Sequence, residues 1–164
     1  MKIDKEQVVQ MLQQVARHMT LLYISIAREV IENYGEDGKD VILKGLETFG
    51  RTRGQRIAER VKKAGKPLTI ENFFEFYDVP VSLIAKPSGE ANITINGKLV
   101  KKIESCPTVK LAEEEGQLEI GKLYCEQDTA MLKGYNPQLR LDKKASLMEG
   151  DECCEFVYSV PEGV

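Results

Sequence analysis

The chain contains no tryptophan, a single histidine and no excess of charge of either sign. The lone histidine, His18, excludes mechanisms that need two imidazoles. It falls at the edge of an apolar helix face, so we expect a boundary residue rather than a general base. The 23 Lys and Arg residues nearly balance the 26 Asp and Glu residues. With a net charge of −3, the chain lacks the basic surface that a nucleic acid partner requires.

Long apolar runs are also missing. The longest, residues 21–27, is far shorter than the roughly 20 residues of a membrane-spanning helix. The N-terminal residues Met1 to Glu6 lack the apolar segment of a secretory signal. We therefore expect a cytoplasmic protein without a membrane partner. In such a reducing compartment, the four cysteines are expected to be thiols or metal ligands rather than disulfides.

The remaining composition is that of a folded chain. Of its 164 residues, 42% are hydrophobic, which is enough for a core that needs neither a disulfide nor a metal. We find no internal repeat and no linker. The sequence therefore predicts a single domain, residues 1–164, with a mainly helical half at 1–80 and a half of mixed helices and antiparallel strands at 90–160.

Residues 5–34 predict a long helix. Asp4 and Gln7 have the capping-box spacing at its start, and Gly35 is a suitable stop at its end. Apolar residues recur along it every three or four positions, the spacing of one helix face. These residues are Val8, Met11, Leu12, Val15, Met19, Leu22, Ile26 and Val30.

A second helix is predicted over residues 39–64, with Arg53 interrupting its apolar stripe. Gly50 and Gly54 lie on either side of this arginine, and Gly45 lies one turn earlier. Because glycine weakens a helix interior, these residues indicate the close approach of another backbone or of a ligand. Arg53 is then either a side chain whose stem covers the core or a clamp for an anion.

The C-terminal half switches to a two-residue periodicity. Residues 91–95 and 99–103 flank an Asn-Gly pair at 96–97, a strong signal for a β-hairpin. Two further strands are predicted at 138–147 and 153–160. Helices followed by hairpins predict an α+β fold, in which the long N-terminal helices pack on an antiparallel sheet built from the C-terminal hairpins.

Two helices are expected between these strands, at residues 108–116 and 117–133. On the second, Cys125 and Asp128 are three residues apart and share a face. Asp128 is either an exposed helix residue or a partly buried carboxylate. In the second case its pKa would be perturbed, and it could act as an acid or a base.

The cysteines come from separate elements. Along the last strand, Cys154 shares a face with Phe156, whereas Cys153 takes the opposite face. Cys106, Cys125 and Cys154 are therefore expected to converge. They could hold zinc, supply a nucleophile or simply be buried thiols, and their spacing lacks the paired C-x-x-C of a zinc signature.

Several short segments, spread over residues 35–158, resemble the L-2-amino-thiazoline-4-carboxylic acid hydrolase family and, more distantly, 4-vinyl reductase-type ligand-binding domains. The segments are Gly50–Gly54, Cys106-Pro107, Ile120–Cys125, Asp128, Gly134–Pro137, Gly150-Asp151 and Cys154–Phe156. The resemblance implies a hydrolase that opens a cyclic, amidine-like C–N bond of a thiazoline ring and forms N-carbamoyl-cysteine.

The resemblance also implies roles for individual residues. Cys106, Cys125 and Cys154 would be the nucleophile or metal ligands, with zinc as the alternative cofactor. Asp128 would be the acid or base. Arg53 would clamp the carboxylate of a small-molecule substrate, and Tyr124 and Asn136 would bind the substrate. The alternatives are a non-catalytic, sensor-like domain that binds a small molecule or a metal, and a helical interaction protein with core cysteines. A homo-oligomer is left open.

Overall fold

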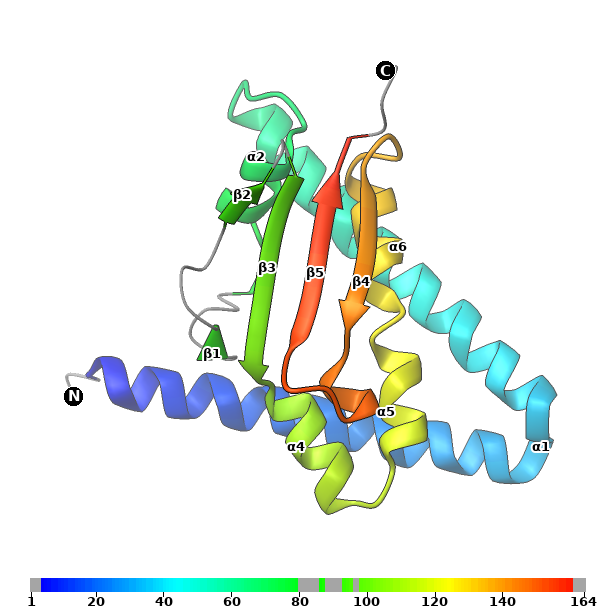
Figure 1. Cartoon of the computed structure of the whole chain (residues 1–164). Coiled ribbons are helices and arrows are strands. Elements are labelled where there is room, and N and C mark those ends of the chain that lie inside the picture. Colours follow the sequence, from blue (N-terminus) through cyan, green and yellow to red (C-terminus); the bar gives the residue numbers. More distant parts are fainter. Residues whose placement is uncertain (1–3, 80–85, 88–92, 96–97, 161–164) are drawn as a thin grey trace.

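The computed structural model describes residues 4–79, 86–87, 93–95 and 98–160, and its longest element is a bent helix, α1 (Lys5–Lys63) (Figure 1). The predicted capping box is present, because the Asp4 carboxylate accepts a hydrogen bond from Gln7 N at 2.8 Å and the Gln7 side chain accepts one from Asp4 N. At Gly35 the backbone has φ 58° and ψ −134°, and the helix bends there. The two predicted helices are therefore two arms of α1 that meet at this glycine.

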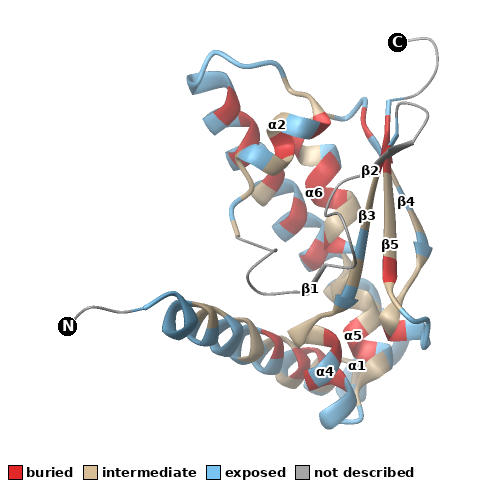
Figure 2. Ribbon diagram, turned by 60° about the vertical axis from the view of Figure 1, so that its left-hand side comes forward, coloured by how far each residue is buried: buried red, intermediate tan, exposed pale blue. Residues whose placement is uncertain are grey.

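The apolar stripe predicted on the first arm of α1 does not face the core. The buried positions of this arm are Thr20, Ile24 and Ala27, on nearly the opposite side of the helix. The structure tolerates the buried Thr20 because its hydroxyl donates to Ala16 O and contacts the Thr108 hydroxyl at 3.1 Å. Members of the stripe are 39–63% exposed, namely Val8, Met11, Val15, Met19, Leu22 and Ile26. In Figure 2 the start of α1 projects away from the rest of the fold.

The shorter helices partly depart from the prediction. They are α2 (Ile70–Glu75), α4 (Pro107–Glu114), α5 (Leu118–Tyr124) and α6 (Gln127–Tyr135). Helix α4 begins at Pro107 with Cys106 as its N-cap residue, one position before the expected start at residue 108. The helix expected over residues 117–133 is broken into α5 and α6. The break arises because the backbone switches to three-residue hydrogen bonds, from Cys125 N to Lys122 O and from Glu126 N to Leu123 O.

The second arm of α1 lies so close to α6 that two of its positions need glycine. A Cβ added at Gly54 would overlap the carbonyl oxygen of Met131, and one added at Gly50 would overlap that of Gln127. Around Gly45, no atom of the described residues lies within 4 Å of such a Cβ. The predicted close approach of another backbone is therefore confirmed at Gly50 and Gly54 and is wrong at Gly45.

The described strands form one antiparallel sheet of order β1-β3-β5-β4, with β2 also pairing with β3. Their bounds are β1 (Lys86–Pro87), β2 (Ile93–Ile95), β3 (Lys98–Ser105), β4 (Arg140–Ala145) and β5 (Cys154–Ser159). Ile95 pairs with Lys98, which is the register of the predicted hairpin, although its Asn96-Gly97 turn lies outside the described residues. Strands β4 and β5 are each shorter than predicted.

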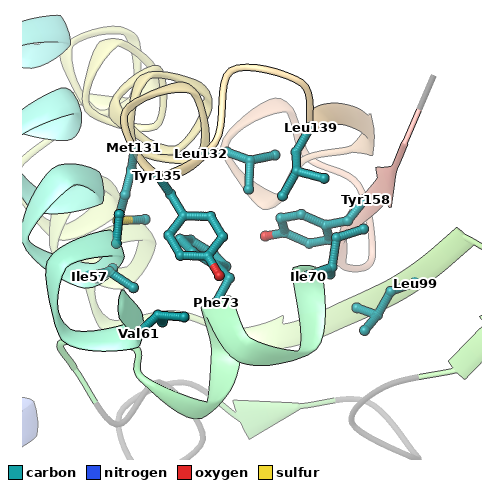
Figure 3. Close-up of a cluster of buried hydrophobic side chains, with 11 residues drawn as sticks. Ile57, Val61, Ile70, Phe73, Leu99, Met131, Leu132, Tyr135, Leu139 and Tyr158 are labelled. Atoms are coloured by element: carbon teal, nitrogen blue, oxygen red, sulfur yellow. The ribbon is translucent and has the colours of Figure 1, made fainter. Parts of the chain in front are cut away.

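Side chains from α1, α2, α6 and the sheet share the main core (Figure 3). This core contains Ile57, Ala58, Val61, Ile70, Phe73, Leu99, Met131, Leu132, Tyr135, Leu139 and Tyr158. A second core lies between the first arm of α1, α4 and α5, around Ile24, Val109 and Ile120. The predicted α+β class is confirmed. In detail, α1 packs mainly against α6, α4 and α5, so helices lie between much of α1 and the sheet.

Over the described ranges, none of the helices combines the length and the apolar character that crossing a membrane would require.

Candidate functional site

Asp128 lies in the first turn of α6 as a partly buried carboxyl group. Burial raises its pKa to about 6, because removal from water disfavours the charged form. The positive charges of Lys143, Arg53 and Lys101 oppose this shift without cancelling it. One carboxylate oxygen accepts a hydrogen bond from Gln127 Nε2 at 2.6 Å. Near neutral pH this group can therefore both accept and donate a proton.

Two lysines reach this region from the inner face of the sheet. In the strand pairing, Lys101 of β3 and Lys143 of β4 lie opposite Phe156 of β5, one on each side. Lys143 Nζ donates to Cys125 O at 2.5 Å and to Glu126 Oε1 at 3.2 Å. Both ammonium groups lower the pKa that burial would otherwise give to Asp128.

The environment of Lys101 is unusual for a lysine. Its Nζ lies 4.5 Å from the ring centroid of Phe74, and burial lowers its pKa, although the charge of Asp128 acts in the opposite direction. Sequence reasoning missed both lysines. The signal was present for Lys101, which stands between Leu99 and Ile103 at the inward positions of a predicted strand.

Arg53 is held by its own chain. Its Nε and Nη2 donate to the Asp78 carboxylate at 2.8 and 2.7 Å, and Nη1 donates to Gln127 Oε1 at 2.7 Å. The arginine side chain is only 14% exposed. Three of its five N–H donors are thus used. The ion pair with Asp78 occupies one edge of the guanidinium and leaves two N–H donors, and the role of Arg53 as an anion clamp stays a prediction.

A chain of hydrogen bonds runs from Asp78 through Arg53 and Gln127 to Asp128. Burial alone would raise the pKa of Asp78, but the hydrogen bonds and the charge of Arg53 outweigh this and lower it. The Asp78 carboxylate is therefore the charged partner of Arg53 at neutral pH. This leaves Asp128 as the member of the chain that changes protonation near pH 6.

Cys106, Cys125 and Cys154 lie close enough to influence one another electrostatically, and Asp128 acts on Cys125 and Cys154. Burial, followed by the charge of Asp128, raises the pKa of the Cys125 thiol, and Cys106 and Cys154 add to this effect. Burial also raises the pKa of Cys154, whose sulfur accepts a hydrogen bond from Leu147 N at 3.3 Å. Cys125 and Cys154 are therefore expected to be neutral thiols at pH 7, which argues against a low-pKa thiolate at either position.

Cys153 lies just before the first residue of β5, and its expected place on the face opposite Cys154 stays a prediction. Within the described ranges, no group of three or more His, Cys, Asp or Glu residues is arranged to hold a metal ion. Cys106, Cys125 and Cys154 are not joined by disulfides, and a zinc site at these residues stays a prediction.

The other residues singled out in the sequence are Tyr124, Asn136 and His18, and they lie in different parts of the fold. Tyr124, at the end of α5, lies near the cluster, since Arg53, Asp128 and Cys106 all affect its pKa, which burial raises. Asn136, at the other end of α6, donates to Leu68 O at 2.9 Å, and its expected part in substrate binding stays a prediction. His18 is exposed on α1 beside Gln14.

A shallow depression of about 190 Å³ opens between α5 and β4. It is lined by Lys122, Cys125, Glu126, Lys143, Lys144, Ala145, Ser146 and Glu149. Pockets for drug-sized ligands usually measure roughly 300–1,000 Å³, so this one suits only a small molecule. Cys125 and Lys143 connect it to the surroundings of Asp128.

Replacing Arg53 with methionine is expected to lower the free energy of unfolding by about 2–3 kcal/mol, because Asp78 would keep its charge without a partner. Denaturant unfolding at pH 7 measures this change. Methionine at the exposed Arg56 serves as the matched control and should change stability by less than about 0.5 kcal/mol. Equal effects at Arg53 and Arg56 would show that the Asp78 pair contributes nothing.

The fold thus places a partly buried, titratable carboxyl group opposite an antiparallel sheet. A similar fold is seen in the crystal structure of a trafficking protein particle complex subunit 3 from Naegleria fowleri covalently bound to palmitic acid. The TM-score is 0.52 and the sequence identity 14%, over 90% of this chain and 95% of that chain. At this identity the likeness shows the fold alone.

The family is shown by the sequence. The family model described as L-2-amino-thiazoline-4-carboxylic acid hydrolase matches residues 13–158, and the chain belongs to this family. The resemblance found in the short segments is thereby confirmed. Comparison with curated proteins gave no match.

Proposed function

We propose that this chain hydrolyses a small cyclic amidine that carries a carboxylate, of the 2-amino-thiazoline-4-carboxylate type, with Asp128 transferring the proton. The observation that carries the proposal is the partly buried Asp128, with a pKa of about 6, among Lys143, Arg53 and Lys101. Family membership supports the class of reaction. A carboxyl group of this pKa serves as base in one step and as acid in the next.

The chemistry requires one water molecule. The Asp128 carboxylate accepts a proton from water as the oxygen bonds to the amidine carbon, and the resulting tetrahedral carbon then expels a ring atom, which receives the proton back. Loss of the ring sulfur yields N-carbamoyl-cysteine, whereas loss of the ring nitrogen yields the S-carbamoyl isomer. The resemblance implies both N-carbamoyl-cysteine as the product and cleavage of a C–N bond, but these belong to two different routes. Identifying the product therefore shows which ring bond is broken.

Lys143 is the better candidate for binding the substrate carboxylate. Arg53, which was expected in this role, is paired with Asp78, whereas Lys143 lines the depression beside Cys125. Two protons of the Lys143 ammonium are used by Cys125 O and Glu126, and an ammonium group has three. The neutral thiol of Cys125 then contributes shape and polarity to the site rather than a nucleophile.

The experiment is turnover of L-2-amino-thiazoline-4-carboxylate by the purified chain. We expect kcat/KM to rise with pH around pH 6 as Asp128 loses its proton. A thiol reagent detects sulfur loss, and mass spectrometry detects the added water. Replacing Lys143 with methionine should raise KM at least about tenfold, which corresponds to about 1.4 kcal/mol of lost binding. The same change at the exposed Lys133 of α6, which does not line the depression, is the control.

Two outcomes contradict the proposal. Binding of the substrate without turnover would favour the sensor-like, non-catalytic alternative. Turnover whose pH dependence lacks a group near pH 6 would exclude Asp128 as the proton-transfer group while leaving the family activity intact.

A further inference from the structure

The exposed apolar stripe on the first arm of α1 has the periodicity of a coiled coil. Six of its residues are spaced by 4, 3, 4, 3 and 4 positions, which is the alternation of a and d sites in a heptad repeat. We call them the α1 seam: Val8, Leu12, Val15, Met19, Leu22 and Ile26. Leu22 is 63% exposed and Val15 54%. A heptad seam indicates a second helix as its partner.

Five of the six seam residues are exposed among the described residues, and Leu12 is half-buried. The first arm uses its other side, at Thr20, Ile24 and Ala27, to contact α4 and α5. Figure 2 shows the start of the arm extending beyond the remaining fold. Between Gln7 and Ala27 the sequence has one Lys, Arg, Asp or Glu residue, Arg17, and it pairs with Glu114. The surroundings of the seam are thus almost free of charge.

We propose that the α1 seam binds the same seam of a second copy of this chain, in antiparallel orientation. The reason is that the spacing of the seam residues is symmetric about position 17. Pairing each position i with position 34 − i places Val15 opposite Met19 of the partner subunit. The next layers join Leu12 to Leu22 of the partner subunit and Val8 to Ile26 of the partner subunit. Each layer thus combines an a site with a d site.

Charge at the ends of the seam supports this register. The same rule places Lys5 opposite Glu29 of the partner subunit, at both ends of the twofold pair. In a parallel pair, each lysine would instead face the lysine of the other copy. Like charges at a pairing position are unfavourable, so the sequence favours the antiparallel arrangement.

The composition of the first arm disfavours a lipid surface as the partner. Helices that lie on membranes usually combine a basic polar face with aromatic residues on the apolar face. The α1 seam contains only Val, Leu, Met and Ile, and the arm carries glutamates as well as basic residues.

The contact is modest in size. From Val8 to Ile26 the seam covers about 27 Å of helix, and a standard complex buries roughly 800 Å² on each partner. One helix pair offers less than that area. We therefore expect a dimer that dissociates at low micromolar concentration rather than a permanent one.

Sedimentation of the full chain over a hundredfold range of concentration tests the proposal, and the wild type should pass from monomer to dimer. Met19→Glu should raise the dissociation constant at least about a hundredfold, because two carboxylates would enter the seam. Gln10→Glu adds the same charge on an exposed side of the helix away from the seam and should leave the dimer intact. Both variants should keep the wild-type melting temperature, because neither position is buried in the monomer.

Exchange of charge tests the register. Lys5→Glu should weaken the dimer, and Lys5→Glu combined with Glu29→Lys should restore it. A chain that stays monomeric at every concentration overturns the proposal, as does a dimer that Met19→Glu leaves unchanged. Failure of the double exchange overturns the antiparallel register. Binding of the wild type, but not of Met19→Glu, to phosphatidylcholine vesicles would replace the second copy with a lipid surface.

Discussion

Alanine at Gly54 is expected to lower the free energy of unfolding by about 3 kcal/mol, at the upper end of what overpacking costs. Its added methyl group would overlap the carbonyl oxygen of Met131, and the nitrogen of Tyr135 lies next to it. These atoms belong to the backbone of α6, so no side chain can rotate away. Relief requires α1 and α6 to separate along their main contact.

Gly45→Ala is the matched control for this prediction. It makes the same change in the same arm of α1, at a position where no described atom lies within 4 Å of the new methyl group. It should raise stability by up to about 1 kcal/mol, because alanine is the better helix former. Denaturant unfolding of both variants gives the two values. Similar effects at the two positions would show that α1 and α6 are less closely packed than the structure indicates.

The close contact also positions the site. Gly50 lies against the carbonyl oxygen of Gln127, the residue that joins Arg53 to Asp128. A change in the spacing between α1 and α6 would therefore move the hydrogen-bond chain that orients the carboxyl group. This explains why glycines flank Arg53 in the sequence, a pattern that alone is compatible with either a ligand or a second backbone.

Periodicity predicted the helices well but not which side of the first arm the chain itself covers. That arm has two faces suited to packing, the apolar seam and a face with small residues such as Ala27. The second face is buried although it contains Thr20, because hydrogen bonds satisfy this hydroxyl. A hydrophobicity scale predicts that the seam is the buried face. In the structure α4 and α5 instead pack against the face that contains Thr20 and Ala27.

The sequence predicted the burial of Asp128 only as one of two alternatives. The spacing of Cys125 and Asp128 drew attention to a carboxylate that the structure places partly buried, even though the expected single helix is broken between them. The pairing of Arg53 with Asp78 joins residues 25 positions apart across a turn. No local pattern in the sequence encodes this ion pair, so the sequence could not show that Asp78 binds the guanidinium.

The second large effect is expected for Asp128→Asn, which should have opposite consequences for activity and stability. Turnover should fall at least about a hundredfold, because asparagine cannot accept the proton from water. The change keeps the oxygen that accepts the Gln127 hydrogen bond, so the fold should persist. The free energy of unfolding at pH 7 should rise by about 1–2 kcal/mol, because the charged form of a carboxyl group with a raised pKa destabilises the folded state.

The pH dependence fixes the sign of this effect. The folded pKa of Asp128 is about 6, above the value near 4 of an unfolded chain, so between these values the folded state binds more protons. The stability that wild type derives from this group is therefore present below about pH 4 and is lost as pH rises through about pH 6. The variant should match wild type at the acid end and exceed it at neutral pH, whereas Asp142→Asn, at an exposed position of β4, should follow wild type throughout. A variant that is less stable than wild type at pH 7 would mean that the cations around Asp128 outweigh its burial, and its carboxylate would then be a structural ion-pair partner rather than a proton-transfer group.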